Sequence, residues 1–600
     1  MKISLNGKWF CEVDKTNAGR KEEWFQQEKF AAKKGSLLDI QIPVSFNTLK
    51  GYEKFEGIFW HYYTFDFDQQ IDDKDAFIEF KGANYFTEAW LNGEPLGNNE
   101  GGFLPFRFKV KDHYIVKKKS NFLVVRVDNV RRIDGIPSLF FDWFHWGGIY
   151  RDVDIAVLER NRVEKVKIKT KLPSRTKANI EISYKEIGSV DFDWFVNEPD
   201  SKDQSKPVVS GSKGDKDVIE FSIENPKLWA PETPQLYKLI IKSKDKQVLY
   251  ETNFGIRQIE ARGYCLYLNK KRIKIRGASL HEELMPYGRS YPYEERENDI
   301  KNMKSYGFNA IRTAHYSHDE SLMDAADKLG ILILEEIPVW GMCNFENPKT
   351  FKLGAKMLKT LIDRDFNHPS VIWWSVGNEV PIERPNCSRF MKRLMDWARK
   401  LDDTRLVTYV SYKFFMDFTQ HKADIAAMNT YLGWYYARVN QLNLMADAMR
   451  AMAPKRPWII SEFGAGAKVG FRGGWKNQLK FSEERQVRVI DHYIRTINSK
   501  DYYAGWFIWI YRDFRSLSRT NQYQQGFNRK GIVSDKNEPK LITKLFPKIV
   551  HEKRKIRSYP ILASLLNAFF FPTLLVVNFI VDYFIAFGSR MMYKRGAKKE

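Results

Sequence analysis

Two glutamates, Glu379 and Glu462, stand directly after short apolar runs in the second half of the chain. Residues 371–376 and 458–460 are rich in tryptophan, isoleucine and valine, which is typical of buried strands. Carboxylates at the ends of two buried strands can act together on one bond, one by proton transfer and the other as a nucleophile or base. The sequence therefore predicts paired acid–base chemistry.

The elements that position these acids follow a repeated order of strand, loop and helix from residue 258 to residue 548. Helical patterns such as 297–307 and 319–329 end at glycines, Gly307 and Gly330, as C-caps do. Eight such units predict a (β/α)8 TIM barrel. The expected strands are residues 272–276, 310–313, 331–334, 371–374, 406–410, 425–428, 458–460 and 506–509.

Polar side chains gather just after these expected strands. In a parallel barrel, the loops that follow the strands share one rim, and that rim carries the chemistry. We therefore expect one shared site. Its members would be drawn from His281, Glu282, Glu283, Arg312, His315, Glu335, Glu336, Asn378, Glu379, Asn429, Tyr431, Glu462, Trp509 and Asp513.

The first 257 residues read as short alternating strands without a long helical period. Residues 1–158 predict a jelly-roll-like β-sandwich, and residues 159–257 predict an immunoglobulin-like β-sandwich. The whole chain is thus expected to be a multidomain β and α/β protein. Asp142 lies in a loop dense in aromatic residues and glycine, where it either caps a turn or reaches into a neighbouring site.

Composition and charge exclude several classes of function. The net charge is +23, but there is no glycine-rich phosphate loop and no nucleic-acid-binding module, so we expect no nucleic acid partner. The four cysteines are scattered and no histidines stand at ligand spacing, so we expect neither disulfides nor a metal, and no cofactor. The first residues contain no apolar secretory core, which predicts a cytoplasmic protein. The many tryptophans and tyrosines suit either sugar stacking or large cores.

Residues 549–600 form a tail of different character. Residues 561–587 are mostly apolar and long enough to cross a bilayer, which needs about 20 residues. Pro572 and three polar residues interrupt the run, and basic clusters stand on both sides of it. This pattern predicts association with a membrane surface, as a re-entrant hairpin, an interfacial helix pair or a single span. The alternative is a helix packed on the barrel or in an oligomer interface.

Several of these stretches carry a family likeness. Residues 367–379 resemble the acid/base signature of glycoside hydrolase family 2, residues 309–316 resemble its second-strand signature, and residues 461–464 resemble its nucleophile strand. Residues 57–63 and 146–151 are similar to its sugar-binding sandwich. The likeness covers residues 1–548 in the family's domain order. It implies a glycosidase that uses two glutamates.

Within that family the chain looks most like the β-glucuronidases. Residues 429–435 are similar to their sixth-strand loop, and Asn528 and Lys530 match the element that holds the sugar carboxylate. Gln524, however, stands where their pattern has an arginine. A similar turn occurs in some β-galactosidases of the family, which remain the alternative.

The resemblance implies roles for individual residues. Glu379 would be the general acid/base and Glu462 the nucleophile of a retaining exo-β-glycosidase. Asn378 would bind the sugar 2-hydroxyl, and Tyr431 would orient Glu462. The remaining expected substrate contacts are Asp142, His315, Asn429, Tyr435, Trp509, Asn528 and Lys530.

The expected partners are β-linked saccharides or glycoconjugates, including glycolipids, together with a membrane surface and a second copy of the chain in a homo-oligomer. Two other functions stay open at this stage. One is a membrane-associated transglycosidase that transfers the sugar to a lipid acceptor, and the other is a catalytically silent carbohydrate-binding protein.

Overall fold

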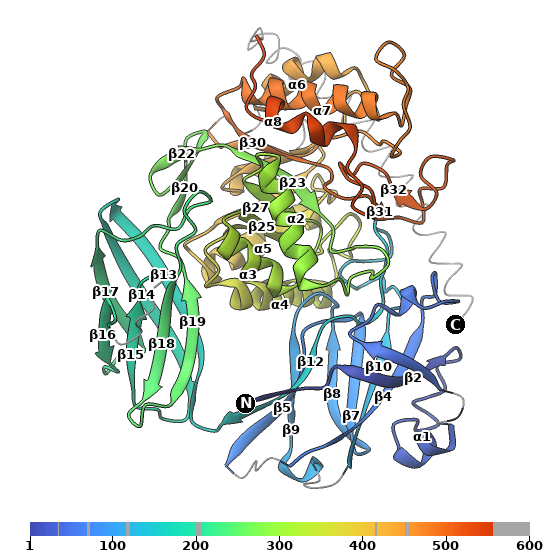
Figure 1. The fold of residues 1–600 in the computed structure, drawn as a ribbon, viewed down its shortest axis with the longest axis vertical. Helices are drawn as coiled ribbons and strands as arrows, with labels where there is room; N and C mark the ends of the chain where they lie inside the picture. The colour runs from blue at the N-terminus through green and yellow to red at the C-terminus, as the bar shows by residue number, and fades with distance from the viewer. Residues whose placement is uncertain are drawn as a thin grey trace.

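A computed structural model describes residues 1–555 except 34, 36, 69–72, 116–119, 200–205, 414–416, 451, 452 and 454. Figure 1 shows two β-sandwiches in the lower half of the view, with the barrel between and above them. The expected fold class, two sandwiches followed by a parallel barrel, is confirmed. The apolar tail, residues 561–587, lies outside the described residues.

The N-terminal sandwich packs two antiparallel sheets face to face. The four-stranded sheet has the order β1 (Lys2–Ser4), β12 (Val153–Glu159), β5 (Lys74–Phe80) and β9 (Phe106–Val110). The six-stranded sheet has the order β3 (Leu38–Ile42), β2 (Gly7–Asp14), β4 (Ile58–Asp66), β10 (Ser120–Asp128), β7 (Phe86–Leu91) and β8 (Glu94–Glu100). Helix α1 (Gln27–Lys33) covers the outer face of this sheet through Phe30, which packs on Tyr62 and Phe122. The short strands β6 (Ala83–Asn84) and β11 (Gly148–Ile149) pair beside the loop that carries Asp142.

The second sandwich follows without a long linker. Its sheets are β13 (Arg162–Ser174), β14 (Lys177–Ile187) and β17 (Val218–Glu224), and β16 (Val209–Ser212), β15 (Phe192–Asn197), β18 (Tyr237–Ser243) and β19 (Val248–Phe254). Alternating side chains such as Ile180, Ile182 and Trp194 fill the space between the sheets. A three-stranded sheet, β20 (Ile259–Arg262), β21 (Cys265–Leu268) and β22 (Lys271–Ile273), leads into the barrel.

Eight parallel strands close the barrel, in chain order and with helices outside them. The strands are β23 (Ile275–Leu280), β24 (Ala310–Thr313), β25 (Leu332–Glu336), β26 (Val371–Asn378), β27 (Leu406–Ser411), β28 (Ala426–Asn429), β29 (Trp458–Glu462) and β30 (Tyr503–Ile508). The helices are α2 (Tyr293–Ser305), α3 (Glu320–Leu329), α4 (Pro348–Asp365), α5 (Pro385–Leu401), α6 (Leu442–Arg450), α7 (Glu483–Asn498) and α8 (Phe546–Ile549). A small hairpin, β31 (Phe514–Arg515) and β32 (Phe527–Asn528), follows the last strand.

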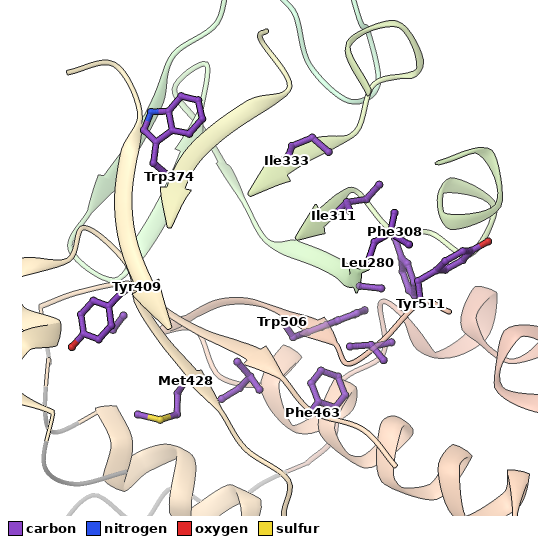
Figure 2. Packing of buried hydrophobic residues seen from close by; sticks show 14 of the residues in the cluster. Leu280, Phe308, Ile311, Ile333, Trp374, Tyr409, Met428, Phe463, Trp506 and Tyr511 are labelled. Carbon is purple, nitrogen blue, oxygen red and sulfur yellow. The ribbon is translucent and has the colours of Figure 1, made fainter. Parts of the chain in front are cut away.

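Strand alternation explains where the barrel core lies. On β25, Ile333 packs outward against the helices, while Leu332 and Leu334 point into the barrel. The outward side chains, among them Ile311, Ile333, Trp374 and Trp506, form the layer between strands and helices seen in Figure 2. The same alternation turns Glu336 inward and Glu335 outward. The polar interior near the strand ends therefore follows from the strand register.

One strand prediction was wrong. Residues 272–276 were expected to begin the barrel, but β22 (Lys271–Ile273) belongs to the entry sheet, and the first barrel strand is β23 (Ile275–Leu280). The small residues of β23, Gly277, Ala278 and Ser279, give a weak apolar signal, although all three are buried. Gly277 is small for a reason, because a Cβ atom there would stand 2.3 Å from the carbonyl oxygen of Ala310.

No helix in the described part of the chain is long and apolar enough to cross a membrane. The same residues contain no group of three or more His, Cys, Asp or Glu side chains able to hold a metal ion. The four cysteines, Cys11, Cys265, Cys343 and Cys387, are free and buried.

Candidate active site

The rim formed by the C-terminal ends of β23–β30, the carboxyl rim, is organised around the buried guanidinium of Arg312. Its Nη1 donates to Glu462 Oε1 at 2.7 Å, and its Nη2 donates to Glu336 Oε1 at 3.0 Å and to Asn378 Oδ1 at 2.8 Å. Arginine has five donors in a planar fork, so it can bind several acceptors at once. One cation on β24 thereby fixes side chains from three other strands.

Glu462, at the end of β29, receives hydrogen bonds on both carboxylate oxygens. Arg312 donates to Oε1, and the hydroxyl of Tyr431 donates to Oε2 at 2.7 Å. The side chain of Glu462 is almost fully buried. Donors on both oxygens and an adjacent cation stabilise the ionised carboxylate and fix its orientation. This is the arrangement that a carboxylate nucleophile needs.

Glu379, directly after β26, is held in a different electrostatic state. Burial and then the negative charge of Glu462 raise the pKa of Glu379 to about 8, although the Asn429 hydrogen bond and Arg312 oppose the shift. Asn429 Nδ2 donates to Glu379 Oε1 at 2.8 Å. Glu379 therefore carries a proton at neutral pH. A carboxyl group with a raised pKa beside a second one that accepts hydrogen bonds on both oxygens is the pattern of an acid and a nucleophile in one site.

Amide side chains join the two glutamates. Asn429 Nδ2 also lies 3.2 Å from Asn378 Oδ1, and Ser461 Oγ donates to Asn429 Oδ1 at 2.9 Å. These contacts fix which end of each amide carries the donors. Within the described residues, the buried Nδ2 group of Asn378 has no hydrogen-bond acceptor. That N–H group is available to a ligand bound between Glu379 and Glu462.

Both glutamates open onto one cavity of about 340 Å³. Its floor includes the indole of Trp509, which stacks on His315 at 4.8 Å between ring centroids and 21° between planes. His315 is itself fixed, because its Nδ1 lies 3.0 Å from Glu336 Oε1. The cavity is lined by Asp142, His315, Trp340, Glu379, Tyr412, Asn429, Tyr431, Tyr435, Tyr436, Glu462, Trp509, Arg519 and Lys530.

One wall of this cavity is cationic. Lys530 Nζ donates to the Tyr435 hydroxyl at 2.6 Å and to Asn528 Oδ1 at 3.3 Å. Arg519 Nη1 donates to the same hydroxyl at 3.3 Å. Two cations therefore meet at the hydroxyl of Tyr435. Such a wall suits a ligand with a carboxylate.

Asp142 reaches the cavity from the N-terminal sandwich. Its carboxylate accepts a hydrogen bond from Ser516 Oγ at 2.7 Å and pairs with the guanidinium of Arg519. Burial alone would raise the pKa of Asp142, but the hydrogen bond and charge of Arg519 outweigh it and lower the pKa. Asn528 Nδ2 approaches the same carboxylate at 3.4 Å. Of the two sequence-based alternatives for Asp142, the structure shows the loop that reaches a neighbouring site.

The structure brings the expected site residues together. The residues expected to act in catalysis or to contact substrate all line the cavity except Asn378 and Asn528, which hydrogen-bond to side chains that do. Trp340, Tyr412, Tyr436 and Arg519 also line it and were not expected. Arg519 and Tyr412 lie in irregular loops, where neither period nor spacing marks a residue. Arg312 was noted only as a strand-end residue, although its three-way contact organises the rim.

Several strand-end residues serve other contacts. Glu282 pairs with Arg151 at 2.7 Å, Glu283 accepts from Trp146 Nε1 at 2.8 Å, and Asp513 pairs with Lys540 at 2.7 Å. Nδ1 of His281 lies 3.1 Å from the Tyr316 hydroxyl. Glu335 faces outward, and burial with the nearby Asp365 raises its pKa well above the usual range. Glu282 and Glu283 instead join the barrel to the N-terminal sandwich.

Family comparisons agree with this geometry. The glycosyl hydrolases family 2 sugar binding domain matches residues 2–158, the central family 2 domain matches residues 161–257, and the family 2 TIM barrel domain matches residues 259–553. The chain belongs to glycosyl hydrolases family 2. It is therefore a glycoside hydrolase, and its nearest resemblance within the family is to β-glucuronidases.

Individual relatives show how far the likeness extends. A putative beta-glucuronidase of Formosa agariphila is 28% identical over 77% of this chain and 60% of its own length. A beta-glucuronidase of Paenibacillus borealis is 24% identical over 90% of this chain and 95% of its own length. A beta-galactosidase of Thermoanaerobacterium thermosulfurigenes is 25% identical over 86% of this chain and 71% of its own length.

Solved structures give the same picture. The beta-glucuronidase of an uncultured Clostridium sp. is 25% identical and superposes with a TM-score of 0.83, covering 91% of this chain and 97% of that one. The Ruminococcus gnavus beta-glucuronidase is 23% identical with a TM-score of 0.84, covering 91% of this chain and 96% of that one. The likeness to the Ruminococcus gnavus structure concerns the fold alone.

Proposed function

We propose that this protein is a retaining exo-β-glucuronidase. The observation that carries the proposal is the pair of glutamates on one cavity, beside a wall that holds Lys530 and Arg519. Glu379 has a raised pKa, and Glu462 accepts hydrogen bonds from Arg312 and Tyr431. The chain is similar to proteins named beta-glucuronidases, including one of known structure, and this similarity supports a β-glucuronide as substrate. A β-galactosidase is the less favoured alternative, because a galactoside has no carboxylate to meet these cations.

In the proposed first step, the ionised Glu462 attacks the anomeric carbon while Glu379 gives its proton to the leaving oxygen. The glycosidic bond breaks, and a covalent glycosyl ester forms on Glu462. Glu379, now ionised, then takes a proton from water, and that water displaces Glu462. The free Nδ2 donor of Asn378 is the proposed partner of the sugar 2-hydroxyl. Tyr431 and Arg312 hold Glu462 in place for attack.

The proposed glycone site uses the remaining lining residues. The sugar carboxylate would meet Lys530 and Asn528, while Trp509 and His315 form the floor and Asp142 binds a ring hydroxyl. An ammonium–carboxylate pair in a largely buried pocket discriminates strongly against neutral sugars. A neutral sugar has no carboxylate, so it leaves the buried cation without its partner.

Azide rescue tests the two catalytic assignments. Glu462→Ala should lose nearly all turnover of an aryl β-glucuronide, and azide should restore the reaction with an α-glucuronyl azide as product. Glu379→Ala should give a β-azide product with an activated leaving group instead. Wild-type turnover by Glu462→Ala would remove the proposed mechanism.

Substrate preference tests the sugar. Lys530→Ala should lower kcat/KM on aryl β-glucuronide by about 100-fold, the scale of a lost charged hydrogen bond of ~3 kcal/mol. It should change turnover of aryl β-galactoside far less. Equal losses on both substrates would contradict a uronic acid at this wall. Lys536→Ala, an exposed lysine in the same segment, is the control for loss of a lysine outside the cavity.

We also retain membrane association of residues 561–587, cytoplasmic location and homo-oligomer formation as proposals that rest on sequence alone. Carbonate washing of membranes from cells that express the full chain tests membrane association. Recovery of all the protein in the soluble fraction, without any wash, would contradict that proposal.

A further inference from the structure

We infer that one flank of the barrel, made of loop 468–480 and the solvent face of α7, is a docking surface for an anionic lipid bilayer. We call loop 468–480 the basic loop. It follows the strand that carries Glu462 and precedes α7 (Glu483–Asn498). The inference goes beyond the proposed hydrolysis, because it concerns where the enzyme sits rather than what it cleaves.

The basic loop exposes large apolar side chains. Trp475 is 56% exposed and Leu479 is 51% exposed. Single exposed apolar residues are ordinary on protein surfaces. A tryptophan and a leucine on one short loop, among cations, are the combination found where proteins enter the headgroup region, since an indole favours the interface of water and lipid.

The charge of the basic loop has one sign. It contains Lys468, Arg472, Lys476 and Lys480, all exposed, and no acidic residue. Arg472 pairs with Glu484, but in the described part of the chain no carboxylate lies within ion-pair distance of the three lysines. Lysines of the second sandwich differ, since many pair with acids there, as Lys238 does with Glu251. The basic loop therefore presents unneutralised charge beside apolar side chains.

The solvent face of α7 continues this charge. Arg488 is exposed and donates to Gln478 Oε1 of the basic loop at 2.6 Å. Further along α7, the charge of Arg495 is neutralised by ion pairs with Asp491 and Glu552. Beyond it lies the exposed run Lys553, Arg554 and Lys555. The strip from the basic loop to this run is thus net positive along about 24 Å of helix.

The chain leaves the described structure at the far end of this strip. Asn498 Nδ2, at the last residue of α7, donates to the carbonyls of Val550 at 3.0 Å and Glu552 at 2.9 Å. Figure 1 shows α7 and α8 together at the same end of the molecule. In the sequence, the apolar residues 561–587 begin shortly after Lys555. A bilayer that holds this apolar segment would face the basic strip, and this favours lipid over a soluble polyanion as the occupant.

The basic loop also touches the segments that build the cavity. Lys480 Nζ lies 4.8 Å from the centroid of the Trp434 ring. Ala467, the residue just before the basic loop, donates through its backbone N–H to the Arg529 carbonyl at 2.7 Å. Trp434 and Arg529 directly precede Tyr435 and Lys530, which form the cationic wall. Docking would therefore hold the cavity beside the lipid headgroups. The corollary, that the substrate is a membrane-borne glucuronide, rests on the proposed function, whereas docking itself does not.

A fluorescent label at position 475 tests docking in the full chain. Trp475→Cys can be labelled selectively with an environment-sensitive nitrobenzoxadiazole dye, because the four native cysteines are buried. The dye should brighten and shift to the blue with phosphatidylglycerol-containing vesicles, and not with pure phosphatidylcholine. A label at Val248→Cys, a 49% exposed apolar position on the second sandwich, should stay unchanged.

Charge removal gives the second measurement. Lys476→Gln with Lys480→Gln should weaken the vesicle affinity reported by the dye about 25-fold, or about fivefold for each cation removed. Sodium chloride at 0.5 M should weaken it further by screening. Lys216→Gln with Lys246→Gln, two exposed lysines of the second sandwich, should leave it unchanged. Turnover of a soluble aryl glucuronide should be the same in all these variants, which checks their folding.

Four results would overturn the inference. The first is a dye at position 475 that does not respond although the chain sediments with vesicles, since the tail alone would then bind the membrane. The second is an equal response to neutral and anionic vesicles. The third is a failure of the full chain to bind vesicles, and the fourth is a dye response to dextran sulfate in place of vesicles. Loss of hydrolysis with an intact dye response would reject the proposed function and leave docking in place.

Discussion

Glu379 occupies an uncommon backbone conformation as well as an unusual electrostatic state. Its φ is 51°, in the left-handed region that non-glycine residues rarely adopt. Such conformations cost of order 1–3 kcal/mol and persist at functional sites where surrounding contacts impose them. Here the backbone N–H of Glu379 donates to the Val410 carbonyl at 2.9 Å, and Asn429 holds the carboxyl group. The conformation is therefore fixed from two neighbouring strands.

The raised pKa of Glu379 predicts the alkaline limit of activity. Because its pKa is about 8 and the protonated form is the proposed acid, kcat/KM for an aryl glucuronide should fall as pH rises through about 8. A pH profile between 5 and 10 measures this limb. Glu379→Gln should remove it, together with most of the rate on substrates with poor leaving groups. A limb that survives in Glu379→Gln would assign the titration to another group.

Tyr431 provides a second prediction at this scale. Tyr431→Phe removes the donor to Glu462 Oε2 and should lower kcat about 10- to 100-fold, the loss for a hydrogen bond of ~1.5–3 kcal/mol to a charged group. KM should change little, since Tyr431 acts through Glu462. Steady-state kinetics of the variant give both constants. Tyr287→Phe, an exposed tyrosine, is the control; a change confined to KM would contradict a positioning role.

The two glutamates of the proposed catalytic pair could be predicted from the sequence more readily than the residues that hold them. Glu379 and Glu462 follow apolar strands, and that position is visible in the sequence. Arg519 was not predicted, because a loop residue has no period and its partner Asp142 lies far away in the chain. The same reason hid the three-way contact of Arg312. Long-range electrostatic contacts depend on the fold, and spacing along the sequence does not encode them.

At the scale of elements, the base of the barrel is linked to the second sandwich through α3 and the segment before β26. Trp229 Nε1 donates to the Asp327 carbonyl at 3.0 Å, and the Asp327 carboxylate binds His368 Nδ1 at 2.6 Å. Burial alone would lower the pKa of His368, but Asp327 raises it to about 9. The histidine is therefore charged in the folded protein at neutral pH.

This ion pair predicts a pH dependence of stability. The folded pKa of His368, about 9, lies above its unfolded value of about 6.5, so its contribution is complete below pH 6.5 and is lost as pH rises through 9. His368→Gln should lower the melting temperature at pH 6 and have little effect at pH 10. Calorimetry across this range measures the difference. A constant offset between wild type and variant would contradict the assigned pKa.

Element boundaries show what patterns can resolve. β24 was predicted at its observed bounds, and the expected helices 297–307 and 319–329 overlap α2 and α3, with Asp319 as the N-cap of α3. The first strand was misplaced because β23 is built of small residues rather than branched ones. Close packing between the strands requires those small residues. The pattern of apolar residues in the sequence does not reveal this steric limit.

At the scale of the molecule, the N-terminal sandwich is part of the site. Its Arg151 is buried and donates to Glu282 Oε2 at 2.7 Å and to the Ser317 carbonyl at 3.1 Å, both on the barrel. The loop with Asp142 and Trp143 then lies over the cavity, where Trp143 packs on His315 with 5.4 Å between ring centroids. Domain docking and the proposed substrate site therefore share one interface.

Breaking that interface should affect both properties. Arg151→Met leaves Glu282 buried without its cation, which should cost about 3–5 kcal/mol of stability and raise KM by displacing Asp142. Denaturant unfolding and steady-state kinetics measure the two effects. Adding Glu282→Gln should recover part of the stability. Lys74→Met, which breaks the exposed pair with Glu159, should change stability by less than about 1 kcal/mol. An unchanged KM in Arg151→Met would separate docking from binding.

The contact between Asp142 and Arg519 spans 377 positions in the sequence. A ribosome makes Asp142 early and Arg519 near the end of synthesis. The cavity wall that joins these two residues is consequently complete only when translation has passed residue 519. A fragment that ends before this point lacks the contact and one of the two cations that meet at Tyr435.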